Sequence, residues 1–254
     1  MQEIMKKLNY LIAGLVMLFS FGNCSKDSQS NNAGTANGAG GSTARFTIVG
    51  DYLYVVDHTS LKAFEIGGSQ GPVYKSQTEI GMNIETIFPY QDKLFIGSSN
   101  SMYIYSLTNP EKPAQLSRSE YQIRMACDPV VARDSVAYAT LRGGSPCGGT
   151  QSQLVVYDIR NVSSPVLKTT VILFNPFGLG VKGNALYVCD NDHGLVVFDV
   201  TNAYAPVETE IIDGHTFYDV IPYGDVLIAQ TDKGIALYDI RIPLEPKFFG
   251  EILN

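Results

Sequence analysis

Short apolar runs separated by polar turn residues recur along the chain after residue 45, a pattern that is typical of buried β-strands. Five runs share one pattern: an aliphatic residue or Met, an aromatic residue three positions later, and then Asp, Glu or Ser. They are Leu61–Ile66, Met102–Leu107, Leu154–Ile159, Leu195–Val200 and Ile235–Ile240. A proline follows each aromatic residue by eight positions, and successive prolines are 41, 52, 41 and 40 residues apart. The chain therefore contains five repeats of about 41 residues, with an insertion in the third.

A second apolar run precedes the first one in every repeat, and a turn signal comes just before it. The turn signals are Gly50-Asp51, Gln91-Asp92, Arg133-Asp134, Gly183-Asn184 and Gly224-Asp225. Such a signal between two apolar runs predicts a tight hairpin. With a further strand beginning near the proline, each repeat supplies four short strands, the pattern of a β-propeller blade.

The predicted fold is all-β, a five-bladed β-propeller of four-stranded blades over residues 45–254. The blades are expected at about 45–81, 82–122, 123–173, 174–214 and 215–254. The last strand is complete at Phe248–Leu253, so the first and last blades are expected to share no strand. Ring closure would then rest on side-chain packing between these two blades.

The strand phrases resemble those of the LVIVD repeat family of bacterial β-propeller lipoproteins. The most similar copies are Ala185–Pro206 and Val226–Pro246, and the first repeat is less similar because Glu65–Gly68 replaces the usual Asp-aliphatic-x-Asn phrase. The resemblance implies a propeller located outside the cytoplasm and implies no particular activity. The chain contains no Trp, which excludes propellers built on Trp motifs, such as WD repeats.

The N-terminal residues 1–23 form a predicted secretory signal. Lys6-Lys7 precedes the mostly apolar stretch Leu8–Phe21, which is too short to span a bilayer comfortably. The residues around Cys24 resemble a bacterial lipoprotein signal, so Cys24 is the expected lipidated residue, with simple secretion as the alternative. Residues 24–44 are rich in Gly, Ala, Ser, Thr and Asn and are predicted to form a flexible tether.

The net charge of the chain limits the classes of partner that it can be expected to bind. The chain has 18 basic and 25 acidic residues, a net charge of −7, and no basic block. Nucleic acid is therefore an unsuitable partner, and the membrane would be contacted only through the lipid anchor.

The expected location is the bacterial outer membrane, on its periplasmic or its cell-surface side. The propeller is expected to be a monomeric domain or a subunit of an envelope complex, without a cofactor.

The insertion in the third repeat, Arg142–Thr150, contains Cys147. In a four-stranded blade, the loop entering the inner strand and the loop between the second and third strands emerge on one face, which we call the insertion face. Cys127 lies in the first of these loops and Cys147 in the second, so a Cys127–Cys147 disulfide is predicted, with two unpaired thiols as the alternative. Such a disulfide would hold the Gly-rich insertion in place.

Polar and aromatic residues of the loops on the insertion face are the candidate binding residues. They are Arg124, Asp128, Arg142, Phe177, Asp190, Asp192, His193, His215 and Asp219. Asp190 and Asp192 alternate as in the opening of a calcium loop, but no bidentate acid follows, so a solvated turn is the favoured alternative. Asp128 and Asp219 begin inner strands, where they would either ring the mouth of the central channel or cap strand ends.

The function predicted from these features is that of a non-catalytic binding or scaffold module for an envelope protein or a glycan. The alternative is a small hydrolase or lyase that acts on a carbohydrate with the carboxylates at the channel mouth. In four of the repeats nearly all residues belong to strands and turns. Few loop residues remain that could form a substrate pocket, which counts against the enzyme alternative. The sequence has no zinc-ligand spacing and no local nucleophile signature, so no catalytic residue is assigned and Asp190 and Asp192 are the sole, weak metal candidates.

Overall fold

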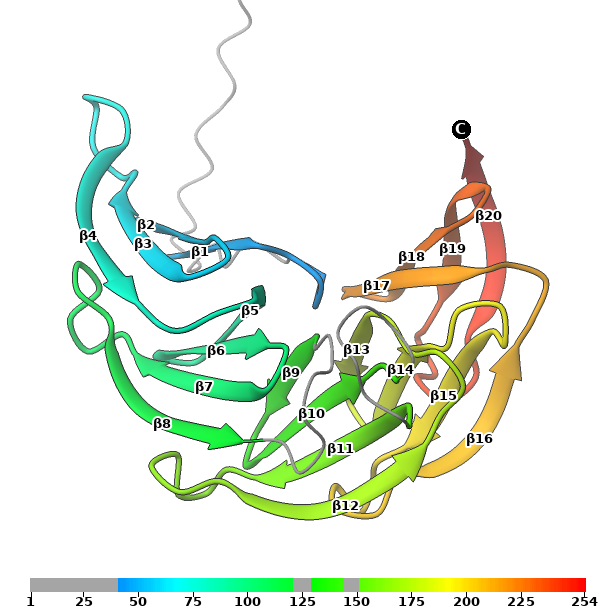
Figure 1. Ribbon diagram of the computed structural model, residues 1–254. Helices are drawn as coiled ribbons and strands as arrows, with labels where there is room; N and C mark the ends of the chain where they lie inside the picture. Colours follow the sequence, from blue (N-terminus) through cyan, green and yellow to red (C-terminus); the bar gives the residue numbers. More distant parts are fainter. Residues whose placement is uncertain (1–40, 121–128, 144–150) are drawn as a thin grey trace, which may run out of the picture. The chain divides into compact units, whose positions relative to one another are not determined.

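The computed structural model describes residues 41–120, 129–143 and 151–254, which belong to one unit of the chain, Thr35–Asn254. These residues form twenty strands and no helix, and the strands make five antiparallel sheets of four strands each (Figure 1). No helix that could cross a membrane is found in the described ranges. In every sheet the four strands lie side by side in the order of the sequence.

Each sheet is built from four consecutive strands of the chain. The first sheet comprises β1 (Phe46–Val49), β2 (Tyr52–Val56), β3 (Ser60–Glu65) and β4 (Val73–Glu79). The second comprises β5 (Ile84–Tyr90), β6 (Lys93–Ser98), β7 (Ser101–Ser106) and β8 (Ala114–Glu120). The third comprises β9 (Val130–Arg133), β10 (Val136–Leu141), β11 (Gln153–Asp158) and β12 (Val166–Ile172). The fourth comprises β13 (Leu179–Lys182), β14 (Ala185–Cys189), β15 (Leu195–Asp199) and β16 (Val207–Ile212). The fifth comprises β17 (Phe217–Tyr223), β18 (Val226–Thr231), β19 (Gly234–Asp239) and β20 (Lys247–Leu253).

Consecutive sheets pack through their first strands: β1 contacts β5, β5 contacts β9, β9 contacts β13 and β13 contacts β17 (Figure 1). Each sheet lies within one of the five predicted repeats. The predicted all-β, five-bladed propeller of four-stranded blades is confirmed, and each sheet is one blade.

A tight hairpin joins the first two strands of every blade. The residue that opens the turn has a positive φ, between 53° and 58°, in all five blades; these residues are Gly50, Gln91, Asp134, Gly183 and Gly224. The predicted turn in the third blade is wrong by one residue, because Arg133 pairs with Val136 and the turn is therefore Asp134-Ser135. A left-handed conformation suits Gly and strains the side chains of Gln91 and Asp134.

Four hydrophobic clusters fill the spaces between consecutive blades. The aromatic residue of the repeated pattern faces the preceding blade, and from the second blade onward it is buried; these residues are Tyr105, Tyr157, Phe198 and Tyr238. The equivalent Phe64 of the first blade has no preceding blade and is only half-buried. The repeated aromatic is therefore the main side chain by which one blade packs on the one before it.

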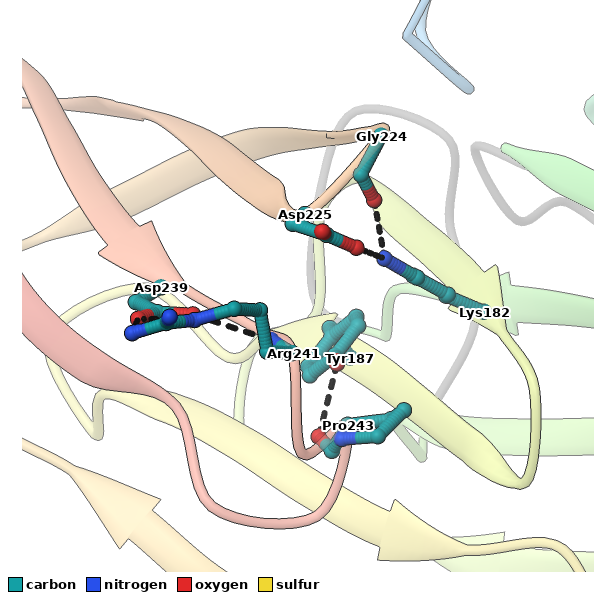
Figure 2. Close-up of polar contacts among 7 residues, drawn as sticks. All are labelled: Lys182, Tyr187, Gly224, Asp225, Asp239, Arg241 and Pro243. Atoms are coloured by element: carbon teal, nitrogen blue, oxygen red, sulfur yellow. Dashed lines mark hydrogen bonds and ion pairs between the residues drawn. The ribbon is translucent and has the colours of Figure 1, made fainter.

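Tyrosine hydroxyls add polar contacts between neighbouring blades. Tyr187 of β14 donates a hydrogen bond of 2.7 Å to the carbonyl of Pro243, in the β19–β20 turn of the fifth blade (Figure 2). The equivalent Tyr54 and Tyr138 donate to the turns of their following blades, each at 2.9 Å. Figure 2 also shows that Lys182, at the end of β13, contacts the Gly224 carbonyl and pairs with Asp225 at 3.0 Å in the β17–β18 turn.

The first and fifth blades each keep one face without a neighbouring blade. Phe46 on the free face of the first blade is 59% exposed, and Tyr223 on that of the fifth is 66% exposed. Among the described residues, no hydrophobic cluster joins these two blades. The blades share no strand, as expected, but closure by side-chain packing between them is not observed.

Candidate functional site

Part of the predicted site lies outside the described residues. Cys24, Arg124, Cys127, Asp128 and Cys147 fall in the ranges 1–40, 121–128 and 144–150. The lipidation site, the disulfide and two members of the candidate binding face therefore remain predictions.

The described candidates lie at one end of the blades. Arg142 directly follows β10, Phe177 precedes β13, the segment Asp190–Gly194 joins β14 to β15, and His215 precedes β17. Because strands alternate in direction within each blade, all of these loops emerge at the same end. This end is the insertion face.

The four residues Gly41–Ala44, which we call the strap, make contacts with three other blades at this end. The backbone N–H of Leu179 in the fourth blade donates to the Ser42 hydroxyl at 2.7 Å. The N–H of Ile87 in the second blade donates to the Ala44 carbonyl at 2.9 Å. Ser42 is 1% exposed. The tether was predicted to run to residue 44, and the strap forms its last four residues in sequence, packed against the propeller.

Asp219 of β17 holds the strap to the fifth blade. Its carboxylate accepts hydrogen bonds from the Ser42 hydroxyl at 3.2 Å and from the Thr43 hydroxyl at 2.7 Å. Burial raises the pKa of Asp219 above its usual value, although hydrogen bonds from Thr43, Val220 and Ser42 oppose the shift. A Cβ at Gly178 would lie 2.0 Å from the carboxylate, so this close approach requires glycine. Asp219 thus binds the strap and does not present a free carboxylate at the channel mouth.

An aromatic and cationic cluster lies beside the strap. The Arg142 guanidinium carbon is 4.1 Å from the centre of the Phe177 ring, a cation–π contact, and Phe177 meets the edge of Tyr218 at 5.8 Å between ring centres. Glu85 of β5 lies close enough to Arg142 and Arg45 for their positive charges to act on its carboxylate. Burial raises the pKa of Glu85, and the positive charges of Arg142 and Arg45 oppose the shift.

The turn from Asp190 to Gly194 has its first carboxylate directed inward. Asp190 is 1% exposed, and its carboxylate accepts hydrogen bonds from the backbone N–H groups of Phe174, at 2.9 Å, and Asn175, at 2.6 Å. Asp192 is exposed. Within the described ranges, no three Asp, Glu, His or Cys side chains come together as metal ligands. The arrangement of Asp190 organises the neighbouring loop.

Phe174 projects from that loop. Its side chain is 74% exposed, and its ring stacks on the ring of His193 with 4.6 Å between centres and an 18° angle between planes. A groove of about 600 Å³ lies next to this pair, between the third and fourth blades. Its lining residues come from β12, β15, β16 and the β10–β11, β12–β13 and β14–β15 loops: Gly143, Gln151, Ser152, Ile172, Leu173, Phe174, Asp190, His193, Val196 and Glu208.

His215 stands apart from this groove. Its Nδ1 atom is 3.8 Å from an Asp232 carboxylate oxygen, and its ring contacts the edge-on ring of Phe217 at 5.8 Å. Cys189 is fully buried in the cluster between the fourth and fifth blades. Neither residue contributes to a surface shared with Phe174.

Sequence reasoning missed Phe174, Tyr218, Glu85 and the strap. Phe174 follows a strand and precedes Asn175-Pro176, which identified a loop but gave no sign that a buried carboxylate would hold it. Ser42 and Thr43 lie in a Gly/Ala/Ser/Thr run whose composition is that of a tether. Their partner Asp219 is 177 and 176 residues away, so no local pattern could identify the contact.

The model of the LVIVD repeat matches residues 40–62, 149–172 and 178–214. The chain carries LVIVD repeats. The third match spans all four strands of the fourth blade, in agreement with the strong copy predicted there. The first match ends at residue 62, before the Glu65–Gly68 phrase that departs from the family pattern, and the three matched segments do not include the fifth repeat.

Solved structures show the same fold as this chain at low sequence identity. A protein described as functionally unknown from Desulfotomaculum acetoxidans has a TM-score of 0.68 and 10% identity, over 83% of this chain and 69% of that one. The computationally designed Ika8 protein has a TM-score of 0.58 and 10% identity, over 82% and 60% of the two chains. Periplasmic gluconolactonase from Pseudomonas aeruginosa has a TM-score of 0.60 and 14% identity, over 80% and 68%. None of the curated proteins matches the chain.

Proposed function

We propose that this chain is a non-catalytic binding or scaffold propeller of the bacterial cell envelope, anchored to the outer membrane through a lipid on Cys24. Its partner is an envelope protein or a glycan, bound at the insertion face. The LVIVD repeats and the propeller fold support a binding role in general terms only, because one fold serves many functions.

The observation that supports this proposal is the state of two carboxylates at the insertion face: Asp219, which the hydrolase alternative would use together with Asp128, and Asp190. Asp128 lies outside the described residues. Asp219 is bound to the strap, and Asp190 accepts two backbone hydrogen bonds. A glycoside-cleaving site needs two carboxylates that converge on the substrate. Among the described residues, Asp190 and Asp219 hold structure in place, which favours binding over catalysis.

Aromatic and Arg side chains at the insertion face are the groups expected to contact the partner. Arg142 and Phe177 stack on each other, Phe177 contacts Tyr218, and the Phe174 ring is largely exposed on a neighbouring loop. Tyr, Phe and Arg are enriched at the energetically important positions of interfaces. These residues are therefore the expected centre of the binding surface.

A charge-reversal pair tests the binding face. Envelope membranes are cross-linked with the tagged full chain, and the proteins and glycans captured with wild type are compared with those captured with Arg142→Glu and Lys112→Glu. Lys112 is exposed in the β7–β8 turn, at the opposite end of the blades. We expect Arg142→Glu to lose the captured species by at least tenfold and Lys112→Glu to keep it. Equal capture by wild type and both variants would contradict the insertion face as the binding site.

The anchor is tested separately. Cells producing the wild type are labelled with palmitate, and incorporation into the chain is measured. We expect label in the wild type, and we expect Cys24→Ala to remove it while the protein becomes soluble after cell fractionation. Label that persists in Cys24→Ala would contradict the anchor and leave the binding role of the propeller intact.

A further inference from the structure

We propose that the groove between the third and fourth blades, at the Phe174–His193 pair, binds a neutral saccharide. This inference rests on the proposed binding function and assigns to it a site and a ligand class. The groove, about 600 Å³ in volume, has the size that is usual for small-ligand sites.

The first observation is the way in which Phe174 is held. Two backbone N–H groups, those of Phe174 and Asn175, donate to the buried carboxylate of Asp190. The N–H of Leu173 donates to the Ser152 carbonyl at 3.1 Å. The backbone on which Phe174 stands is therefore fixed, while its side chain remains 74% exposed. A ligand that covers this fixed ring would gain the free energy of removing its apolar surface from water, with little loss of backbone entropy.

The second observation is the flat surface that results. One face of the Phe174 ring lies against the His193 ring at 4.6 Å. The electron-rich face of an aromatic ring attracts the slightly positive hydrogen atoms of C–H groups. One side of a pyranose ring offers several such C–H groups together, so a sugar can lie flat on Phe174.

The third observation is the polar rim of the same groove. Gln151 offers an exposed amide and Glu208 an exposed carboxylate. The Ser152 hydroxyl is buried and accepts from the Gly143 N–H at 3.2 Å, which leaves its own proton to donate. Together they can both donate and accept hydrogen bonds, as the equatorial hydroxyls of a sugar require. A side wall of Ile172, Leu173 and Val196 leaves the remaining surface apolar.

The charge of the groove selects neutral sugars. The described residues that line it include Asp190 and Glu208 and no Lys or Arg. An acidic sugar or a phosphorylated one would bring its negative charge towards Glu208 without a cation to balance it. A hydroxyl of a neutral sugar, in contrast, can donate to that carboxylate in a charge-assisted hydrogen bond.

The test uses the purified full chain on an array of immobilised neutral hexasaccharides: cello-, malto-, xylo-, manno- and chito-oligomers. The strongest binder is then titrated by calorimetry against wild type, Phe174→Ala, Glu208→Gln and the control Phe249→Ala. Phe249 is a 56% exposed aromatic on β20, in the fifth blade. We expect Phe174→Ala to weaken binding at least tenfold, Glu208→Gln to weaken it severalfold, and Phe249→Ala to bind as wild type.

Either of two results would overturn the saccharide site: an array on which nothing binds at millimolar concentration, or unchanged affinity in Phe174→Ala. A blank array together with capture that depends on Arg142 would remove the saccharide site and leave the proposed function standing. A blank array together with capture that is insensitive to Arg142→Glu would remove both. Circular dichroism of each variant shows that the blades remain folded.

Discussion

At the scale of single residues, the contacts between blades depend on which side chain stands at one repeated position of the second strand. Tyr54, Tyr138 and Tyr187 reach the turn of the next blade with their hydroxyls. The second blade has the fully buried Phe95 at this position, which packs in the same way and cannot donate a hydrogen bond. The equivalent position therefore carries an aromatic ring with a hydroxyl in three blades and without one in the second blade.

Tyr187→Phe is expected to lower the free energy of unfolding by about 1 kcal/mol, because the Pro243 carbonyl loses its partner while the ring stays packed. Urea unfolding followed by far-ultraviolet circular dichroism measures the change. The matched control is Tyr74→Phe, whose ring is 56% exposed on β4. If Tyr187→Phe and Tyr74→Phe unfold at the same urea concentration as wild type, the hydrogen bond makes no net contribution.

At the scale of elements, the five hairpins adopt one turn conformation with different residues. Gly occupies the left-handed opening position in three blades, while Gln91 and Asp134 occupy it in the other two. The conformation is set by the strands that the turn connects, because the tertiary pairing outweighs the local preference of one residue. Turn composition therefore predicted all five hairpins, and placed the third turn one residue too early.

Gln91→Gly is expected to raise the free energy of unfolding by about 0.5 kcal/mol. Relief of the left-handed strain, which costs roughly 1 kcal/mol, outweighs the greater entropy that Gly gives the unfolded chain. Thermal unfolding of the purified domain measures the shift in Tm. The reverse change, Gly183→Ala at the equivalent φ of 56°, is expected to lower Tm. A lower Tm for Gln91→Gly would show that the Gln91 side chain stabilises its turn.

Much of each blade could be predicted from the sequence, and much of the candidate site could not. The strands follow from short apolar runs such as Leu195–Phe198, which are buried on both faces of the blade and are recognisable within a few positions. Phe174 and Ser42 owe their positions to the carboxylates of Asp190 and Asp219, which are distant in sequence. A polar contact of this kind leaves no periodic signal in the sequence. The repeated strands could therefore be predicted, and the positions of Phe174 and Ser42 could not.

At the scale of the whole propeller, the strap joins the first blade to the second, fourth and fifth through polar contacts. The contact with the fifth blade depends on Asp219, a buried acid whose pKa is raised mainly by burial. Holding the ionised form of Asp219 inside the protein costs free energy that is absent in the unfolded chain. This cost disappears as pH falls through the raised pKa of the folded state.

The stability difference between wild type and Asp219→Asn is therefore expected to depend on pH. Asp219 binds its proton more tightly when folded, so its contribution favours the folded state most below the unfolded pKa of about 3.9 and is lost as pH rises through the folded pKa. Wild type should gain stability relative to Asp219→Asn between pH 7 and pH 4, measured by urea unfolding at each pH. A difference that is constant with pH, or that changes in the opposite direction, would contradict the raised pKa of Asp219.

The place of the strap also determines how the propeller would respond to mechanical load. A pull on the chain before Gly41 reaches Ser42 and Thr43 before it reaches β1, so it is first resisted by their bonds to Asp219 and Leu179. Leu179 belongs to the fourth blade and Asp219 to the fifth, so both blades would share the tension before it reached β1. A propeller tethered in this way would yield by release of a few side-chain hydrogen bonds, with its blades still folded.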